Sequence, residues 1–258
     1  LYAHLGAPKP NFAGYFVVQF DQPITACGTV AGGTARPGAR EAQADALSAY
    51  AQFAPAAGEN VVRARVGTSF IGVEQARENL RREIADWDLA RVEAQGRAAW
   101  NAQLGRVSIS GGDADARRVF YTCLYHAHLY PRTFSEYGRY YSAFDDAVHA
   151  GDCAYNDYSL WDTFRAQHPL LTLTAPERVG PMVTSLLQMY REGGWLPLWP
   201  NPGYTGMMIG SPADPVIADA WQKGLRDFDL ALAYEAVRKS ATVPQQGDEG
   251  KKWPNVGP

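Results

Sequence analysis

The stretch Tyr158-Ser159-Leu160-Trp161-Asp162-Thr163-Phe164-Arg165-Ala166 places a large aromatic ring, a carboxylate, a hydroxyl group and a guanidinium within five consecutive positions. In carbohydrate sites an indole such as that of Trp161 stacks on the C–H face of a sugar, and a carboxylate such as that of Asp162 accepts hydrogen bonds from neighbouring hydroxyls. A structural alternative is a buried Trp161 beside an Asp162 that caps a helix or pairs with Arg165. The stretch alone favours neither interpretation.

The bulk composition is that of a globular protein with a sizeable core. The chain has 258 residues, of which 46% are hydrophobic and 20% charged, enough for one large domain or two ordinary ones. A net charge of -3 gives no support for nucleic-acid binding or for a polybasic membrane contact. The aromatic share of 12% suits sugar binding, although large aromatic cores give the same number.

Cysteines, apolar runs and chain ends exclude other classes. Cys27, Cys123 and Cys153 match no metal-ligand spacing, and their odd number excludes a complete disulfide framework. The longest apolar runs, such as residues 15–20, are too short to span a membrane. The chain begins at Leu1 without a recognisable signal peptide and finishes in a Pro- and Gly-rich stretch, so we interpret it as a piece of a longer polypeptide.

The first 75 residues predict β-structure. Runs of β-branched and aromatic residues are separated by Gly and Pro clusters, which is typical of short antiparallel strands. The glycines near residue 30 lack the spacing of a dinucleotide-binding loop. The predicted strands are 15–20, 24–30, 47–53 and 61–70.

From residue 73 the hydrophobic period becomes helical. The clearest helix covers 176–192, with Thr174 expected as its cap, Pro176 in its first turn and Gly193-Gly194 at its end. Residues 74–103 predict one long linker helix. The remaining predicted helices are 114–129, 215–223 and 227–240.

Aromatic-rich loops lie between these helices, at 137–161 and 194–208. Helices joined by long loops that carry Trp, Tyr, Asp and Gly are typical of an all-α toroid with a sugar cleft at one end, because loops on a rigid scaffold often carry function. In the second loop, Trp195 and Trp199 are candidates for stacking a second sugar, with plain packing as the alternative. About five helices follow residue 110, fewer than half of the twelve in an (α/α)6 barrel.

Several ordered blocks resemble the exo-acting α-mannosidases of glycoside hydrolase family 92 over roughly residues 55–240. The stretch quoted above is one of them. The others are His168-Pro169-Leu170-Leu171-Thr172-Leu173, Pro176-Glu177-Arg178-Val179, Gly193-Gly194-Trp195-Leu196-Pro197-Leu198-Trp199, Thr205-Gly206-Met207-Met208-Ile209-Gly210 and Val216-Ile217-Ala218-Asp219-Ala220.

This resemblance implies a mixed fold in three parts. Residues 1–72 would be the C-terminal part of a β-sandwich, 73–110 a helical linker and 111–258 the first, incomplete part of an (α/α)6 barrel. It also implies a calcium-dependent, inverting enzyme, periplasmic or secreted, that releases terminal mannose from N-glycans, mannan or manno-oligosaccharides. Trp161 and Asp162 fall where the family lines the pocket for the non-reducing mannose.

The resemblance assigns no catalytic residue and no metal ligand to this chain. In the family, the general acid, the general base and the calcium ligands lie in motifs beyond the blocks above, and neither a Glu-Gly-Asn-Ala-Trp nor a Gly-Asn-Asp-Asp stretch occurs here. The chain alone is therefore predicted to be inactive. Pro212 stands where the family commonly carries a His, so linkage preference could differ.

Other candidate sites are interpreted as structural. Asp145, Asp146, Asp152 and Asp157 lack the spacing of an EF-hand and predict a solvated loop. His126 and His128 alternate on a predicted helix and would not chelate one metal, so packing is expected for them and also for His149 and His168. Two alternatives to a mannosidase stay open: a non-catalytic carbohydrate-binding or structural module, and another (α/α)6-barrel glycosidase.

Overall fold

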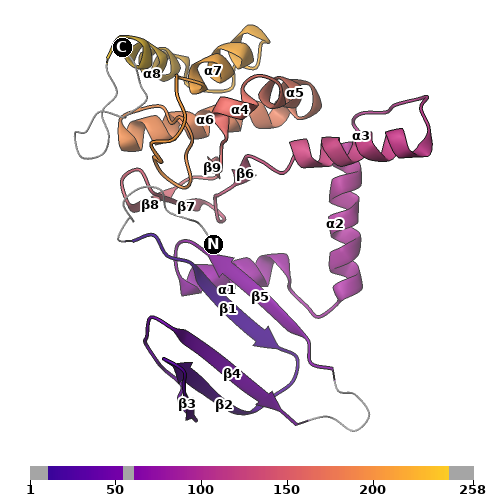
Figure 1. Cartoon of the computed structure of the whole chain (residues 1–258), viewed down its shortest axis with the longest axis vertical. Helices are drawn as coiled ribbons and strands as arrows, with labels where there is room; N and C mark the ends of the chain where they lie inside the picture. Colours follow the sequence, from indigo (N-terminus) through magenta and orange to yellow (C-terminus); the bar gives the residue numbers. More distant parts are fainter. Residues whose placement is uncertain (1–10, 55–60, 244–258) are drawn as a thin grey trace. The chain divides into compact units, whose positions relative to one another are not determined.

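The computed structural model describes residues 11–54 and 61–243, which fall into two compact units (Figure 1). Residues 14–92 form one unit, and residues from 93 onward form the other together with the segment before residue 14. The first ten residues of the predicted β-region lie outside the described residues. Each unit is considered by itself.

The first unit contains two small antiparallel sheets. In one, β1 pairs with β5; in the other, β2 lies between β3 and β4. The strands predicted at 15–20 and 47–53 are confirmed to the residue, whereas the short β3 was not predicted. The strands are β1 (Tyr15–Phe20), β2 (Ile24–Ala31), β3 (Thr34–Pro37), β4 (Leu47–Phe53) and β5 (Ala64–Ser69).

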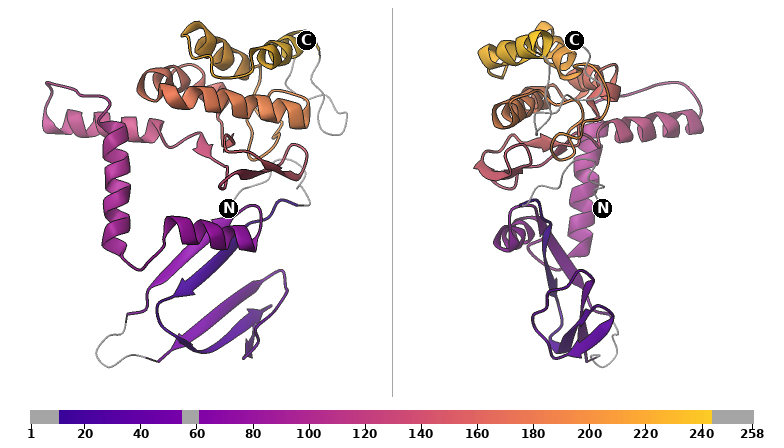
Figure 2. Two further views of the ribbon diagram at one scale, coloured as in Figure 1. Left: turned by 180° about the vertical axis from the view of Figure 1, so that it is seen from behind. Right: turned by 60° about the vertical axis from the view of Figure 1, so that its left-hand side comes forward.

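Helix α1 (Val73–Glu83) covers one face of the β1–β5 sheet (Figure 2). Gly67 on β5 permits this close approach, because a Cβ there would lie 2.2 Å from the carbonyl oxygen of Ala76 and 2.6 Å from Cβ of Leu80. Ala76 and Leu80 are buried against the strands as a result. The residues that alternate to the opposite face, Phe16 and Val66, remain exposed.

The single linker helix predicted over 74–103 is wrong. Helix α1 ends at Glu83 and α2 (Leu89–Leu104) begins after a break. Asp88 explains the restart, since its Oδ1 accepts from the Arg91 amide at 3.0 Å in the manner of an N-cap. At the end of α1, the Arg65 guanidinium donates to the Ile84 carbonyl at 2.8 Å and lies over the ring of Trp87.

The second unit is mostly helical, and α6 runs through its core (Figures 1 and 2). Buried side chains of α6 contact α5, α7 and α8. Besides α2, the helices are α3 (Ala114–Ala127), α4 (Leu160–Thr163), α5 (Gln167–Thr174), α6 (Pro176–Gly193), α7 (Ala213–Gln222) and α8 (Leu230–Thr242).

The predicted boundaries of α6 are confirmed, but its predicted cap is not. Pro176 lies in the first turn, and Gly194 closes the helix at φ 86° with its amide donating to the Tyr190 carbonyl. No side chain caps the N-terminus. Thr174 belongs to α5, where its hydroxyl donates to the Leu170 carbonyl at 3.0 Å.

Part of the predicted aromatic loop 137–161 folds into short paired strands, including the β7–β8 hairpin. β7 (Arg139–Ser142) pairs with β8 (Ala147–Ala150), and β6 (Arg132–Thr133) pairs with β9 (Tyr155–Asn156). The buried Ser185 hydroxyl joins β9 to α6, accepting from the Tyr155 amide at 2.9 Å and donating to the Tyr155 carbonyl at 3.1 Å. Among the described helices, none combines the length and apolar character needed to cross a membrane.

Candidate functional site

Two buried side chains fix the position of the quoted stretch. Tyr158 and Leu160 are 1% and 0% exposed, and the Tyr158 hydroxyl donates to the Met182 carbonyl of α6 at 2.9 Å. The short helix α4 that follows places Trp161 half-buried and Asp162 exposed. Tyr158 and Leu160 therefore pack into the core, and Trp161 and Asp162 do not, which is the arrangement expected for a pair that contacts a ligand.

Neither structural role considered for Asp162 is present. No side chain caps α4, and the Asp162 carboxylate makes no hydrogen bond or ion pair with any described residue. Arg165 instead lies over the rings of Trp161 and Phe164, at 4.7 and 4.6 Å from their centroids, and donates to the Trp161 carbonyl. The carboxylate is thus available to another partner.

Trp199 is brought to the same site by a hydrogen bond that no local sequence pattern predicts. Its indole Nε1 donates to the Ser159 hydroxyl at 2.9 Å, joining the loop after α6 to the residue that precedes α4. The Trp199 carbonyl in turn accepts from the Thr205 hydroxyl at 2.6 Å. Trp161, Asp162 and Trp199 thus lie on two segments held together at Ser159.

Trp195 packs against α8 instead. The ammonium group of Lys239 lies 4.4 Å from the centroid of its ring and donates to the Gly194 carbonyl. The Tyr204 hydroxyl accepts from the Trp195 amide and donates to its carbonyl. One face of this indole is therefore covered by a cation, as one face of Trp161 is by Arg165.

Buried polar atoms without partners occur on the same two segments. Buried polar groups in folded proteins are nearly always hydrogen-bonded. Here each such atom lacks a partner among the described residues, which indicates that water, a ligand or further polypeptide supplies one. The atoms are Asp157 Oδ1, Thr163 Oγ1, Asn201 Oδ1 and Asp214 Oδ1.

Asp214, in the first turn of α7, is a residue that sequence reasoning missed. Burial raises the pKa of its carboxyl from 3.8 to about 7. An acidic residue in the first turn of a helix is common, so the sequence carries no signal for this shift. Burial likewise raises the pKa of Asp157, opposed by the guanidinium of Arg132 with which it forms an ion pair.

The acidic residues of the 145–157 region have separate partners rather than one shared cation site. Asp146 accepts from the Tyr141 hydroxyl at 2.7 Å and from the Asn11 amide. Asp157 pairs with Arg132 and Asp145 with His149. The prediction of a merely solvated loop is therefore corrected, since three of these carboxylates are bonded.

His126, His128 and His168 have the structural roles expected. His126 is exposed, while His128 lies between the Leu124 carbonyl and the Thr174 hydroxyl, at 2.7 and 3.0 Å. His168 is buried and stacks on Tyr158, and burial lowers its pKa from 6.5 to about 4. None of these three imidazoles faces Trp161 in a described contact.

A separate hollow of about 310 Å³ lies between α2, the segment after α3 and the start of α6. Its wall includes Trp100, His128, Arg132 and Met182, and it does not include Trp161, Asp162 or Trp199.

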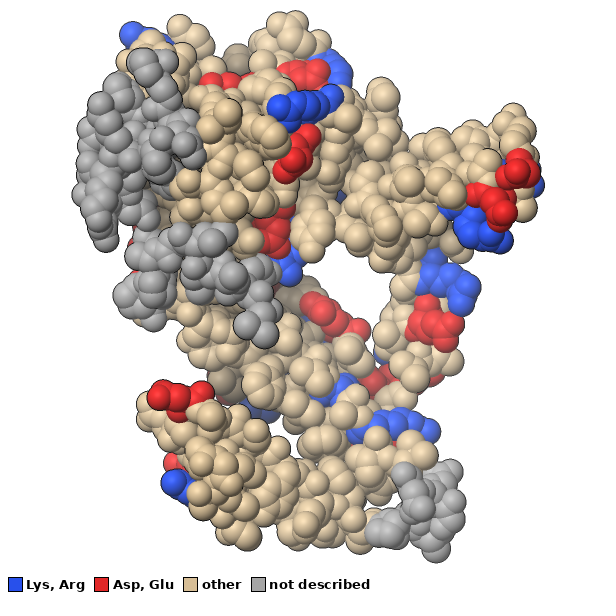
Figure 3. Space-filling model, viewed as in Figure 1, with Lys and Arg blue, Asp and Glu red and all other residues tan. Residues whose placement is uncertain are grey.

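On the face shown in Figure 3, acidic and basic side chains lie in mixed groups. Near the start of α2, for example, Arg91 pairs with Asp86.

The chain belongs to glycosyl hydrolase family 92. Residues 75–257 match the family's catalytic domain, and residues 2–69 match its N-terminal domain. The resemblance read from the ordered sequence blocks is thereby confirmed. The chain is therefore a member of a glycosidase family.

Solved relatives support the same assignment. A family GH92 inverting mannosidase from Bacteroides thetaiotaomicron is 39% identical over 93% of this chain, with a TM-score of 0.87. A second family GH92 α-mannosidase from the same organism is 27% identical over 88% of the chain, with a TM-score of 0.77.

A relative found by sequence agrees with the solved structures. This uncharacterized secreted glycosidase from Arthroderma benhamiae is 33% identical over 223 residues, or 81% of this chain.

The chain spans a minor part of each relative. It covers 33% and 32% of the two bacterial structures and 24% of the fungal glycosidase.

Proposed function

We propose that this chain contributes the non-reducing sugar subsite of an inverting, exo-acting α-mannosidase. Terminal mannose of N-glycans, mannan or manno-oligosaccharides would be the substrate. The observation that carries the proposal is the likeness to an inverting mannosidase over 93% of the chain, at 39% identity and a TM-score of 0.87. A second α-mannosidase neighbour has been solved with mannoimidazole bound, which supports a mannose-shaped site in that fold.

The residues at Ser159 have the chemistry that such a subsite requires. The exposed Asp162 carboxylate, unpartnered among the described residues, would accept hydrogen bonds from two sugar hydroxyls. Arg165 lies over Trp161 on one side, so the other side of the indole would stack on the sugar ring. Trp199, tied to Ser159, would border the same subsite, and Trp195 on the same loop would be a weaker candidate for stacking a second sugar.

Proton transfer belongs to residues outside this sequence. Inversion requires a carboxylic acid that protonates the leaving oxygen and a carboxylate about 6.5–9.5 Å away that activates water. No role in proton transfer is assigned to Asp162, which would bind and orient the sugar. We further propose that residues 111–258 form the first part of an (α/α)6 barrel, following a linker at 73–110 and the later part of a β-sandwich at 1–72.

The described residues do not fit the calcium ion of the family. Calcium takes six to eight oxygen ligands. Among described residues, the one close group of three His, Cys, Asp or Glu side chains is Asp145, His149 and Glu192, which includes an imidazole nitrogen. We therefore place the calcium ligands of the working enzyme outside this chain. A secreted or periplasmic location is also proposed, supported by the secreted fungal relative.

The test is hydrolysis of α-linked manno-oligosaccharides by two purified polypeptides: residues 1–258, and a longer protein that includes the downstream coding region. We expect no turnover by the first, and turnover by the second that a chelator abolishes. Proton NMR of the fresh product should show the β-anomer of mannose. Turnover by residues 1–258 above a buffer control would contradict the assignment of acid and base.

A carbohydrate-binding module is the second candidate, because no catalytic carboxylate is assigned to the chain. It predicts that the longest encoded protein binds mannosides in calorimetry without hydrolysing them. The same two preparations therefore separate the two functions.

A further inference from the structure

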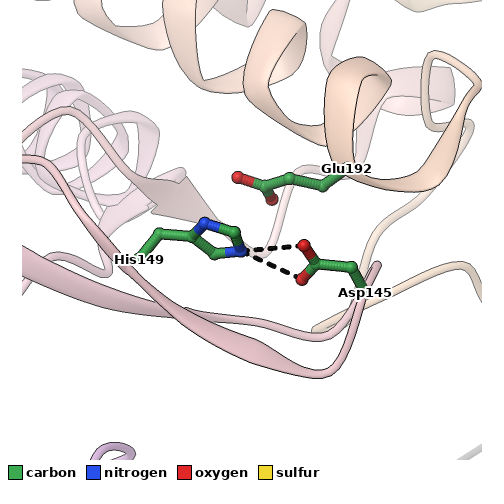
Figure 4. A group of neighbouring side chains, drawn as sticks. All are labelled: Asp145, His149 and Glu192. Atoms are coloured by element: carbon green, nitrogen blue, oxygen red, sulfur yellow. Dashed lines mark hydrogen bonds and ion pairs between the residues drawn. The ribbon is translucent and has the colours of Figure 1, made fainter.

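We propose that Asp145, His149 and Glu192 form a binding site for a divalent transition-metal cation of the Zn²⁺ type. Asp145 lies in the turn between β7 and β8, His149 on β8, and Glu192 in the last turn of α6. One ligand atom from each residue lies within 4.8 Å of the other two. Figure 4 shows the Glu192 side chain extending from the helix over the His149–Asp145 pair.

The distances are close to those that a metal requires. Bonds of about 2.0–2.1 Å to a tetrahedral Zn²⁺ place neighbouring ligand atoms about 3.3 Å apart. His149 Nε2 already lies 2.8 and 3.1 Å from the two oxygens of Asp145. The Glu192 oxygen lies within 4.8 Å of both partners and would move closer to them to complete the set.

Tyr140 supports two of the three ligands. Its hydroxyl donates to Glu192 Oε1, and its ring stacks on the His149 imidazole with centroids 5.4 Å apart and planes at 25°. Tyr140 is itself buried, at 6% exposed. Hydrogen bonds and packing that orient ligands in this way are typical of metal sites and strengthen binding.

Electrostatics at this position favour a cation. The group holds two carboxylates, whose negative charge a bound cation would neutralise. The site also lies at the C-terminal end of α6, where the helix dipole contributes partial negative charge. Imidazole with carboxylate is a donor set that suits zinc and its neighbours, whereas calcium prefers oxygen alone.

The bound cation would fasten the β7–β8 hairpin to the end of α6. Helix α6 ends at Gly193, and the loop that begins at Gly194 carries Trp199 of the proposed sugar subsite. The site is distinct from the proposed subsite at Ser159 and does not depend on the proposed mannosidase activity. The competing interpretation is a plain His149–Asp145 ion pair, with Glu192 serving only as acceptor for Tyr140.

Calorimetric titration of Zn²⁺ into the chelator-stripped, full-length polypeptide tests the proposal. Asp145→Asn, His149→Gln and Glu192→Gln should each weaken one Zn²⁺ site at least about tenfold, and Tyr140→Phe about tenfold. His126→Gln, at an exposed imidazole on α3, is the matched control and should leave that site unchanged. Ca²⁺ should produce no comparable heat at this site.

The melting temperature of each variant without metal shows whether it folds. Asp145 lies at an exposed hairpin turn, so Asp145→Asn still tests the site if another variant fails to fold. Replacing Zn²⁺ by Co²⁺ should give visible absorption bands that disappear in His149→Gln. Equal Zn²⁺ affinity in the wild type and the three ligand variants would overturn the proposal. So would the absence of any Zn²⁺ site in the wild type, or a site that takes Ca²⁺ but not Zn²⁺.

Discussion

Helix α6 and the two segments joined at Ser159 are built in opposite ways. Along α6, apolar side chains such as Val183 and Leu186 are fully buried, and the polar Ser185 is satisfied by Tyr155. On the segments at 157–163 and 194–214, the Asp162 carboxylate is exposed and makes no described bond, and four buried oxygens lack described partners, as does Gln188 Oε1 on α6. The burial along α6 indicates that it provides stability, whereas the exposed Asp162 carboxylate supports the proposal that the two segments bind a sugar.

The largest effect that would sharpen this comparison is expected at Leu186→Ala. Leu186 is 0% exposed, and removing such a side chain from a packed core costs about 2–5 kcal/mol in the free energy of unfolding. Denaturant unfolding of residues 1–258 measures this loss, and kcat of the folded fraction of the full-length, active enzyme should not change. Leu173→Ala is the matched control, because Leu173 is 78% exposed and its loss should cost less than about 0.5 kcal/mol. Similar losses for both variants would contradict the assigned core.

His168 makes the stability of the helical unit depend on pH. Below pH 6.5 the unfolded chain protonates this imidazole, while the buried one stays neutral until about pH 4. The unfolded state then binds more protons, so stability is fully present above pH 6.5 and falls by up to about 3 kcal/mol toward pH 4. Urea unfolding between pH 7 and 4 should show a shallower fall in His168→Gln, even if that variant is less stable throughout.

The control is His126→Gln, which removes an exposed imidazole and should keep the wild-type pH dependence. An unchanged slope in His168→Gln would show that other groups control the acid sensitivity.

The sequence predicts correctly those strands and helices whose apolar residues follow a clear local period. The strands at 15–20 and 47–53 and helix α6 follow from alternation or from a 3.6-residue period. The break between α1 and α2 was missed because it depends on Asp88 capping the second helix and on Arg65 reaching Ile84 from a strand.

The residues of the candidate site could be predicted only in part. Trp161 and Asp162 were predicted because they are adjacent and belong to a recognisable sequence block, and their role in sugar binding stays a prediction. The Ser159–Trp199 bond, the burial of Asp214 and the pairing of β6 with β9 arise from contacts between segments that are distant in the sequence. No local pattern encodes such contacts, so sequence reasoning had no access to them.

The smallest effect considered concerns the bond between Ser159 and Trp199. Ser159→Ala or Trp199→Phe should each cost about 1 kcal/mol of stability, because each removes one side-chain hydrogen bond. The double variant should cost less than the sum, since the second change removes nothing further. Strict additivity in a double-mutant cycle would show that the bond does not hold the two segments together.

The most direct test of the sugar subsite is Asp162→Ala in the active, full-length enzyme, with kcat/KM on an α-mannoside and melting temperature measured on one sample. A hydrogen bond to a charged group is worth about 1.5–3 kcal/mol, so kcat/KM should fall about ten- to a hundredfold or more while the melting temperature stays near that of the wild type. Asp162→Asn keeps the size of the side chain and one acceptor oxygen, so its loss of kcat/KM should be smaller. A lower melting temperature with normal kcat/KM would contradict the account and remove Asp162 from the site.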